Sequence, residues 1–224
     1  MIKGLLLDFY GTVVEDDDAY MERIAAYVAS RASVPISADD VGRAWTQEYY
    51  AAASGPVFRT LRECARTSLG IVMAEVGCAG DPAELCGDQF RSWQTPPLRS
   101  GTREFLSAVD LPICIVSDVD RHDLDAALAY HGLAFTAVVT SEDVGAYKPD
   151  QAMFTTALAT LKRQPDEVMH VGDSLTSDIA GAHTAGIRAI WINRHNRPTP
   201  ADAPSTHEIP DLSALTAILD RQRG

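Results

Sequence analysis

Short apolar runs that stop at a polar residue dominate the pattern along this chain. The first run begins at Ile2, is interrupted only by Lys3 and Gly4, and ends at Asp8. Runs of this length, bounded by turn-forming residues, are typical of strands buried in a parallel sheet. Four more runs of this character follow, and a short sixth strand is expected near the end: residues 111–116, 135–139, 168–171, 188–192 and 208–209.

Apolar residues at helical spacing fill most of the chain between these runs. From about residue 15 to residue 95 the pattern predicts helices alone, whereas beyond residue 100 predicted strands and helices alternate. Such alternation predicts an α/β fold with a parallel sheet. We therefore expect a discontinuous α/β core at residues 1–14 and 96–224, and an inserted all-helical cap at residues 15–95 that lies over the edge of the sheet.

Charge and composition narrow the classes of function. The formal net charge is -12 and the pI is about 4.8, which argues against a nucleic-acid partner and against docking on anionic membranes. No apolar run approaches the roughly 20 residues of a transmembrane helix. The N-terminus has no signal-peptide pattern, and the four cysteines show no C-x-x-C pairing, so we expect a cytoplasmic protein with reduced thiols: Cys64, Cys78, Cys86 and Cys114.

Polar side chains follow four of the predicted strands. Asp8 ends the first, Ser117 the second, Lys148 lies in the loop after the third, and Asp173 follows the fourth, with Asp178 five residues on. Because the carboxyl ends of parallel strands meet at one edge of the sheet, we expect these side chains to converge on one crevice.

In order and spacing, these motifs resemble those of the haloacid dehalogenase-like hydrolase superfamily. The resemblance spans nearly the whole chain and implies a Rossmann-like core with a helical cap inserted after the first strand. Each motif alone is weak, and their order at successive strand ends is what makes the resemblance specific: Asp8-Phe9-Tyr10-Gly11-Thr12, Ser117, Lys148-Pro149 and Gly172-Asp173-Ser174-Leu175-Thr176-Ser177-Asp178.

The resemblance implies a role for each of these positions. Asp8 is the expected nucleophile, which forms an aspartyl ester or aspartyl phosphate, and Lys148 is expected to hold Asp8 and the substrate together. Mg²⁺ is the implied cofactor, because hard oxygen ligands suit it. Its expected ligands are Asp8, the carbonyl oxygen of Tyr10, Asp173 and, directly or through water, Asp178. The expected substrate contacts are Gly11, Thr12, Ser117, Asp118 and Lys148.

Tyr10 departs from the pattern of the family's phosphatases. These usually carry a second Asp at this position, which protonates the leaving group and then activates water. The dehalogenases of the family have a similar Asp-x-Tyr-Gly-Thr segment, but they carry Ser where Asp173 stands and usually Asn at the position of Asp118. We interpret the chain as a Mg²⁺-dependent phosphatase of a small phosphorylated metabolite, acting as a monomer or homodimer. The alternative is a metal-free 2-haloacid dehalogenase.

Two further kinds of function are compatible with a haloacid dehalogenase-like fold, a phosphonate hydrolase and a non-catalytic binding protein. A phosphonate hydrolase needs a cap lysine, but the only lysines are Lys3, Lys148 and Lys162, all outside the cap. The absence of the second Asp favours a pseudo-hydrolase that only binds a phosphometabolite or a protein partner. The presence of four other site residues argues against it: Asp8, Lys148, Asp173 and Asp178. His170 lies among apolar strand residues and is interpreted as a core histidine.

Overall fold

The computed structural model describes residues 1–198 and 207–221. The chain divides into two compact units. The first comprises Met1–Asp16, Pro97–Asp118 and the chain from Leu133 onward, and the second comprises Asp17–Pro96 and Val119–Gly132. The chain therefore leaves the first unit twice, once after the first strand and again after the second.

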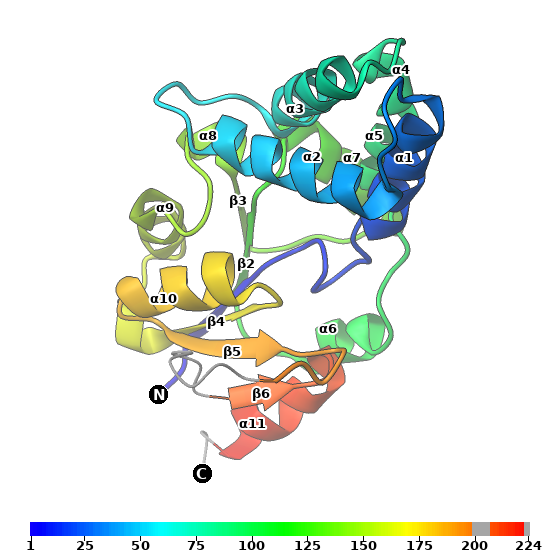
Figure 1. The fold of residues 1–224 in the computed structure, drawn as a ribbon. Coiled ribbons are helices and arrows are strands. Elements are labelled where there is room, and N and C mark those ends of the chain that lie inside the picture. Colours follow the sequence, from blue (N-terminus) through cyan, green and yellow to red (C-terminus); the bar gives the residue numbers. More distant parts are fainter. Residues whose placement is uncertain (199–206, 222–224) are drawn as a thin grey trace. The chain divides into compact units, whose positions relative to one another are not determined.

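A six-stranded sheet forms the centre of the first unit (Figure 1). All strand pairs are parallel, and the order is β3-β2-β1-β4-β5-β6, which is the order of a doubly wound Rossmann sheet. The strands are β1 (Gly4–Leu7), β2 (Ile113–Ser117), β3 (Ala137–Thr140), β4 (Val168–Gly172), β5 (Arg188–Ile192) and β6 (His207–Ile209).

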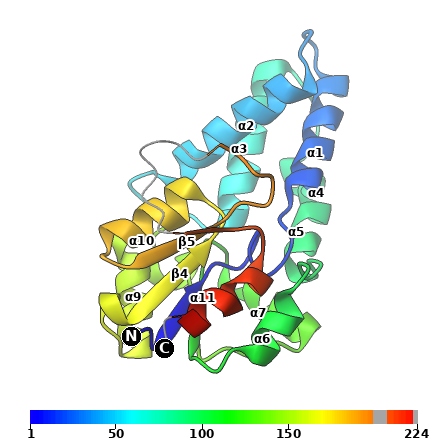
Figure 2. The same cartoon turned by 90° about the horizontal axis from the view of Figure 1, so that it is seen from below.

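Helices cover both faces of this sheet. α9 (Gln151–Leu161) and α10 (Ala180–Thr184) lie on one face, and α6 (Thr102–Ala108) and α11 (Leu215–Arg221) on the other (Figures 1 and 2). Strands buried on both faces need apolar residues throughout, which explains why β1 reads Gly-Leu-Leu-Leu without a polar position. Short elements complete the unit: α8 (Ser141–Val144), η1 (Pro165–Glu167), the π-helical turn η2 (Leu175–Ile179) and η3 (Leu212–Ala214).

The second unit is entirely helical in the described residues. It contains α1 (Asp18–Arg31), α2 (Ala38–Ala53), α3 (Leu61–Val76), α4 (Pro82–Leu85), α5 (Gly87–Gln94) and α7 (Arg121–His131). Trp45 is fully buried and donates its indole N–H to Ser68 Oγ at 2.9 Å, so α2 and α3 share a packed core with a satisfied polar group. None of the described helices has the length and apolar character needed to cross a membrane.

The expected fold class is confirmed: a parallel Rossmann-like sheet with a helical insertion. One helix is grouped differently from the expectation, since α7 belongs with the helical unit and not with the α/β unit. Asp123 on α7 is fully buried and binds Arg62 on α3 through two hydrogen bonds of 2.7 and 2.5 Å. Asp120 accepts the N–H groups of Leu61 and Arg62 at the start of α3. That the helical unit covers the edge of the sheet stays a prediction.

Replacing Asp123 with Ala should destabilise the protein by about 3 kcal/mol, because the loss of one member of a buried ion pair leaves the other uncompensated. Asp125→Ala is the control, since among the described residues Asp125 forms a single exposed pair, with Arg121 at 3.6 Å, and its cost should stay within about 0.5 kcal/mol. Urea unfolding of the three proteins measures both values, and equal effects of the two substitutions would contradict this assignment.

Candidate active site

The carboxyl ends of three neighbouring strands meet at one edge of the sheet. β1 pairs with both β2 and β4, which places Leu7 opposite Ile115 and Val171. Asp8 continues the pairing by one bond, since its N–H donates to the Val171 carbonyl oxygen at 2.9 Å. Asp8 therefore lies at the point where the strand order reverses between β1 and β4, and doubly wound sheets bind their ligands at such points.

A tight turn follows Asp8 and brings the backbone close to Asp173. The Phe9 carbonyl oxygen accepts the N–H groups of Val13 and Val14 at 2.8 and 3.0 Å. Gly11 has φ +84°, and a Cβ atom at this position would lie 2.7 Å from Asp173 Oδ2. Glycine is thus needed both for the positive φ and for the approach of the carboxylate.

Lys148 connects the carboxylates of two strand ends. Its ammonium Nζ donates to Asp8 Oδ1 and to Asp178 Oδ1, both at 2.7 Å, and the side chain is 2% exposed. The backbone N–H of Lys148 donates to Asp118 Oδ1 at 2.8 Å. Burial by itself lowers the pKa of Lys148, but the carboxylates of Asp178, Asp8 and Asp118 outweigh it and raise the pKa well above its usual range. These carboxylates therefore favour the protonated, cationic form of Lys148.

Asp178 is the most completely bonded carboxylate of the site. Its Oδ1 accepts from Lys148 and lies 3.0 Å from His170 Nε2, and its Oδ2 accepts the Ser174 N–H at 3.1 Å. Burial alone raises the pKa of Asp178, yet Lys148 and His170 outweigh this and hold it well below its usual range. His170 is fully buried, as the sequence indicates, but it also contacts this site residue, which its apolar neighbours on the strand do not reveal.

When all three are ionised, Asp8, Asp173 and Asp178 carry more negative charge than Lys148 alone balances. One oxygen of each lies within 4.8 Å of the others, and the buried Asp8 Oδ2 has no hydrogen-bond partner among the described residues. Burial, only partly offset by Lys148, raises the pKa of Asp8. Burial and the charges of Asp8 and Asp178 raise the pKa of Asp173 to about 8. Clustered hard oxygens with an unmatched charge fit a divalent cation such as Mg²⁺.

The remaining predicted site residues lie in the same unit. Ser117 is the last residue of β2 and is buried, and burial raises the pKa of the adjacent Asp118 to about 7. Thr12 is buried, and its Oγ1 has no hydrogen-bond partner among the described residues. The Tyr10 ring packs edge-on against Phe9 at 5.1 Å. The catalytic and binding roles of these residues stay predictions.

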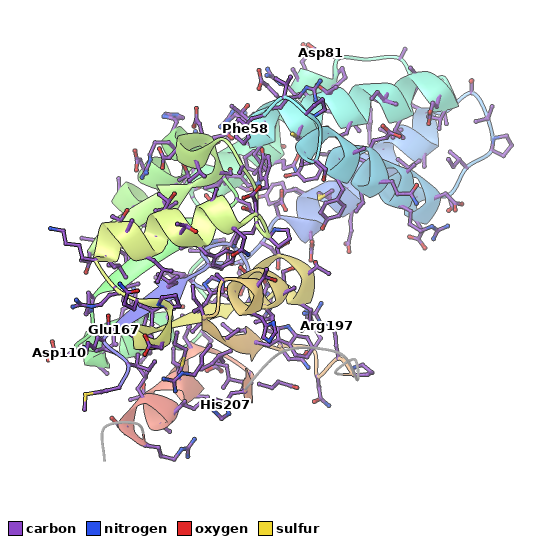
Figure 3. All side chains as sticks on the ribbon, turned by 90° about the vertical axis from the view of Figure 1, so that its left-hand side faces the viewer. Phe58, Asp81, Asp110, Glu167, Arg197 and His207 are labelled. Atoms are coloured by element: carbon purple, nitrogen blue, oxygen red, sulfur yellow. The ribbon has the colours of Figure 1, made fainter. Side chains whose placement is uncertain are left out.

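Two arginines that are not among the predicted site residues, Arg194 and Arg197, also contact Asp173. Arg194 Nη2 lies 3.0 Å from Asp173 Oδ2 and 2.8 Å from Asp16 Oδ2. Arg197, in the segment after β5 (Figure 3), donates to the Asp173 carbonyl oxygen and stacks over the Trp191 ring. In the sequence, the feature that could identify these arginines is that β5, like the strands before it, is followed by polar residues.

Comparison with known proteins gives one family and two kinds of chemistry. A family model described as haloacid dehalogenase-like hydrolase matches residues 2–186. A phosphoserine phosphatase of Thermus thermophilus is 35% identical over 149 residues, which is 62% of this chain and 59% of that protein. The chain thus covers less than two thirds of this relative's length. The (S)-2-haloacid dehalogenase H-109 of Pseudomonas putida is 24% identical over 224 residues, 96% of each chain.

Solved structures support the fold. The HAD-hydrolase YfnB of Bacillus subtilis, in a crystal structure bound to magnesium, superposes with a TM-score of 0.74 at 24% identity, over 98% of this chain and 99% of that one. At this identity the likeness concerns the fold alone. Neither comparison distinguishes phosphate-ester from carbon–halogen hydrolysis, so the residues of the site must be used for that distinction.

The pKa shift of Asp173 predicts how a divalent cation will affect stability. The folded protein holds this proton more tightly than the unfolded chain, so ionisation of Asp173 costs stability as the pH rises from about 4 to about 8. A cation binds the ionised form and offsets this cost. At about a hundred times its Kd, Mg²⁺ should raise the Tm by roughly 5–10 °C, and by less at about pH 6 than at about pH 9.

Asp173→Asn should abolish this response and raise the Tm of the EDTA-treated protein at about pH 9. Asp110→Asn is the control, since Asp110 is exposed on the connection between α6 and β2 (Figure 3). It should respond to Mg²⁺ as the wild type does. Differential scanning fluorimetry with MgCl₂ or EDTA across this pH range makes the measurement, and a Tm indifferent to both would contradict the cation site.

Proposed function

Because this chain belongs to the haloacid dehalogenase-like hydrolases, we propose that it is a divalent-cation-dependent phosphatase of small phosphorylated molecules, with Asp8 as the nucleophile. The observation that carries the proposal is Asp173 beside Asp8 and Asp178. Displacement of halide from carbon needs no cation, and a third, partly buried carboxylate would only add repulsion to such a site. Phosphoryl transfer brings an anion towards Asp8 and does need one.

The two carboxylate oxygens of Asp8 have different contacts, which suggests different roles in the reaction. Lys148 holds Asp8 Oδ1, while Oδ2 has no hydrogen-bond partner among the described residues. In the proposed reaction an Asp8 oxygen attacks phosphorus, the bond to the leaving oxygen breaks, and water later releases phosphate from the aspartyl phosphate. Lys148 would stabilise the negative charge that develops on the transferring oxygens.

Mg²⁺, when bound, would neutralise the charge between Asp8 and the phosphoryl group. Asp8, Asp173 and the Tyr10 carbonyl oxygen are the proposed direct ligands. Asp178 already accepts hydrogen bonds on both oxygens, so it is better suited to a water-mediated contact. We also propose that Ser117, Gly11 and Thr12 contact the transferring group, as the resemblance implies.

Tyr10 limits which substrates such an enzyme hydrolyses well. A phenol with a pKa near 10 is a poor base at neutral pH, so a leaving alkoxide lacks the usual proton donor. We therefore propose that aryl and acyl phosphates, whose leaving groups need little protonation, are the better substrates. Asp118, whose burial raises its pKa to about 7, is the alternative proton donor if alkyl phosphates are hydrolysed equally well.

The second candidate is a metal-free 2-haloacid dehalogenase, and two observations favour it. The Asp8-Phe9-Tyr10-Gly11-Thr12 segment is similar to that of the family's dehalogenases, and the dehalogenase of Pseudomonas putida matches over nearly its full length. In that reaction an Asp8 oxygen attacks the carbon that bears the halogen, halide leaves, and water hydrolyses the ester.

Side-by-side assays of phosphate and halide release separate the two chemistries. The substrates are 4-nitrophenyl phosphate, an alkyl phosphate and 2-chloropropionate, each with MgCl₂ or with EDTA. We expect Mg²⁺-dependent release of phosphate from the aryl ester and slower hydrolysis of the alkyl ester, by roughly 10²–10⁴-fold. Asp8→Asn should remove the activity. Halide release that survives EDTA, without phosphate release, would establish the dehalogenase instead.

Tyr10→Asp supplies the missing acid and should raise kcat/KM for the alkyl phosphate, by up to about 10²-fold. Tyr10→Phe is the matched control, since it removes only the hydroxyl group and should leave the aryl phosphatase activity nearly unchanged. If wild type already hydrolyses alkyl phosphates as fast as aryl phosphates, another acid acts. In that case Asp118→Asn should reduce the alkyl rate more than the aryl rate.

A further inference from the structure

We propose that Arg194 is a tethered counter-ion that competes with the divalent cation for Asp173 and thereby weakens cation binding. The inference rests on the proposed cation site and adds a residue that sets its affinity. Arg194 lies two residues after the end of β5, at the carboxyl edge of the sheet.

The contacts of Arg194 place one cation among three carboxylates. Its Nη2 lies 3.0 Å from Asp173 Oδ2 and 2.8 Å from Asp16 Oδ2, and its Nη1 lies 3.5 Å from Glu15 Oε2. The side chain is 14% exposed. Arginine stays protonated at every physiological pH, and its planar fork can serve several carboxylate oxygens at once. In the cation-free protein the guanidinium therefore already pairs with the ionised form of Asp173.

The position of Arg194 is fixed by the residues beside it. Asn193 continues the pairing of β5 with β6, since its N–H donates to the Ile209 carbonyl oxygen at 2.8 Å. Its side-chain amide donates to Glu208 Oε1 and to the Arg197 carbonyl oxygen, and its Oδ1 accepts the Arg197 N–H at 2.9 Å. A turn held by these bonds directs Arg194 towards the same edge as Asp173.

Competition follows from the charges. A dication held by Asp173 and a guanidinium on the same carboxylate repel each other across a half-buried site, where solvent screens charges poorly. Asp16 and Glu15 give Arg194 two other anchors, so it can leave Asp173 without becoming unpaired. Cation binding must then displace Arg194 or tolerate the repulsion, and each lowers the affinity.

If Arg194 instead orients Asp173 for the cation, its removal should change the cation affinity in the opposite direction. If the contact with Arg194 held the Asp173 carboxylate in the geometry that the cation needs, loss of the guanidinium would weaken binding, as the loss of groups that orient metal ligands usually does. The sign of the change in affinity therefore distinguishes competition from orientation.

Arg99 provides a matched control. Its Nη1 binds the same Glu15 Oε2 at 2.6 Å, and its side chain is 13% exposed. Arg99→Gln removes the same charge from the same acidic group of residues, but among the described residues Arg99 makes no hydrogen bond or ion pair with Asp173. A general effect of net charge on cation binding would appear in both variants, whereas a contact-specific one would appear only in Arg194→Gln.

The test is isothermal titration of EDTA-treated protein with MgCl₂, and with MnCl₂ as a second probe. We expect Arg194→Gln to bind Mg²⁺ about tenfold more tightly than wild type, within the usual range of coupling between two bound species. Arg99→Gln should stay within about twofold of wild type. Arg194→Lys, which keeps the charge but loses the fork, should lie between wild type and Arg194→Gln. Melting curves in EDTA verify that each variant is folded.

Weaker or unchanged binding by Arg194→Gln would overturn the inference while leaving the cation site in place. Equal tightening in Arg194→Gln and Arg99→Gln would overturn it too, since the effect would then be one of net charge. If wild type and all three variants fail to bind Mg²⁺ or Mn²⁺, the proposed cation site itself is wrong, and the inference falls with it. Should Arg194→Gln not fold, Arg194→Lys decides, and its binding must exceed that of wild type.

Discussion

The unmatched negative charge around Asp8 is the constraint on which the rest of this site depends. Three buried or partly buried carboxylates lie within reach of one another, and Lys148 balances only part of their charge. Such a group is costly to fold unless each charge is paired or hydrogen-bonded. The site meets this cost with Lys148 and His170 on Asp178, with Arg194 on Asp173, and by raising the pKa of Asp8 and Asp173.

The sheet order is what makes this concentration of charge possible. β1 lies between β2 and β4, so residues that follow strands more than a hundred positions apart in the sequence meet at one edge. The reversal of strand order beside β1 leaves that edge accessible to a ligand. The positive φ of Gly11 lets the loop after β1 approach Asp173, which a Cβ atom would prevent. Topology and one glycine thus bring the acids together before any cation binds.

The sequence predicts the strands and the convergence of the polar residues that follow them, because buried parallel strands are short apolar runs and the residues after them must share an edge. The roles of these residues stay predictions. The sequence could not predict contacts that depend on tertiary packing. The grouping of α7 with the helical unit involves Arg62 and Asp123, which are 61 positions apart. Arg194 reaches Asp173 only because a turn at Asn193 directs it there, and nothing in the local pattern around either arginine marks its partner.

The two features that point to different chemistry, Tyr10 and Asp173, act on different parts of the proposed reaction. Asp173 concerns the charge that accumulates when an anion approaches Asp8, whereas Tyr10 concerns the proton that a leaving group needs. A haloacid needs neither a cation nor a proton donor, because halide is a stable anion. A phosphate ester attacked by a carboxylate needs positive charge to offset the repulsion between the two anions, and it needs the proton donor only when its leaving group is basic. A site that keeps Asp173 but has Tyr10 in place of the second Asp is therefore chemically consistent with phosphates of acidic alcohols or acids. In a dehalogenase, Asp173 would have no function to offset the cost of placing a third carboxylate beside Asp8 and Asp178.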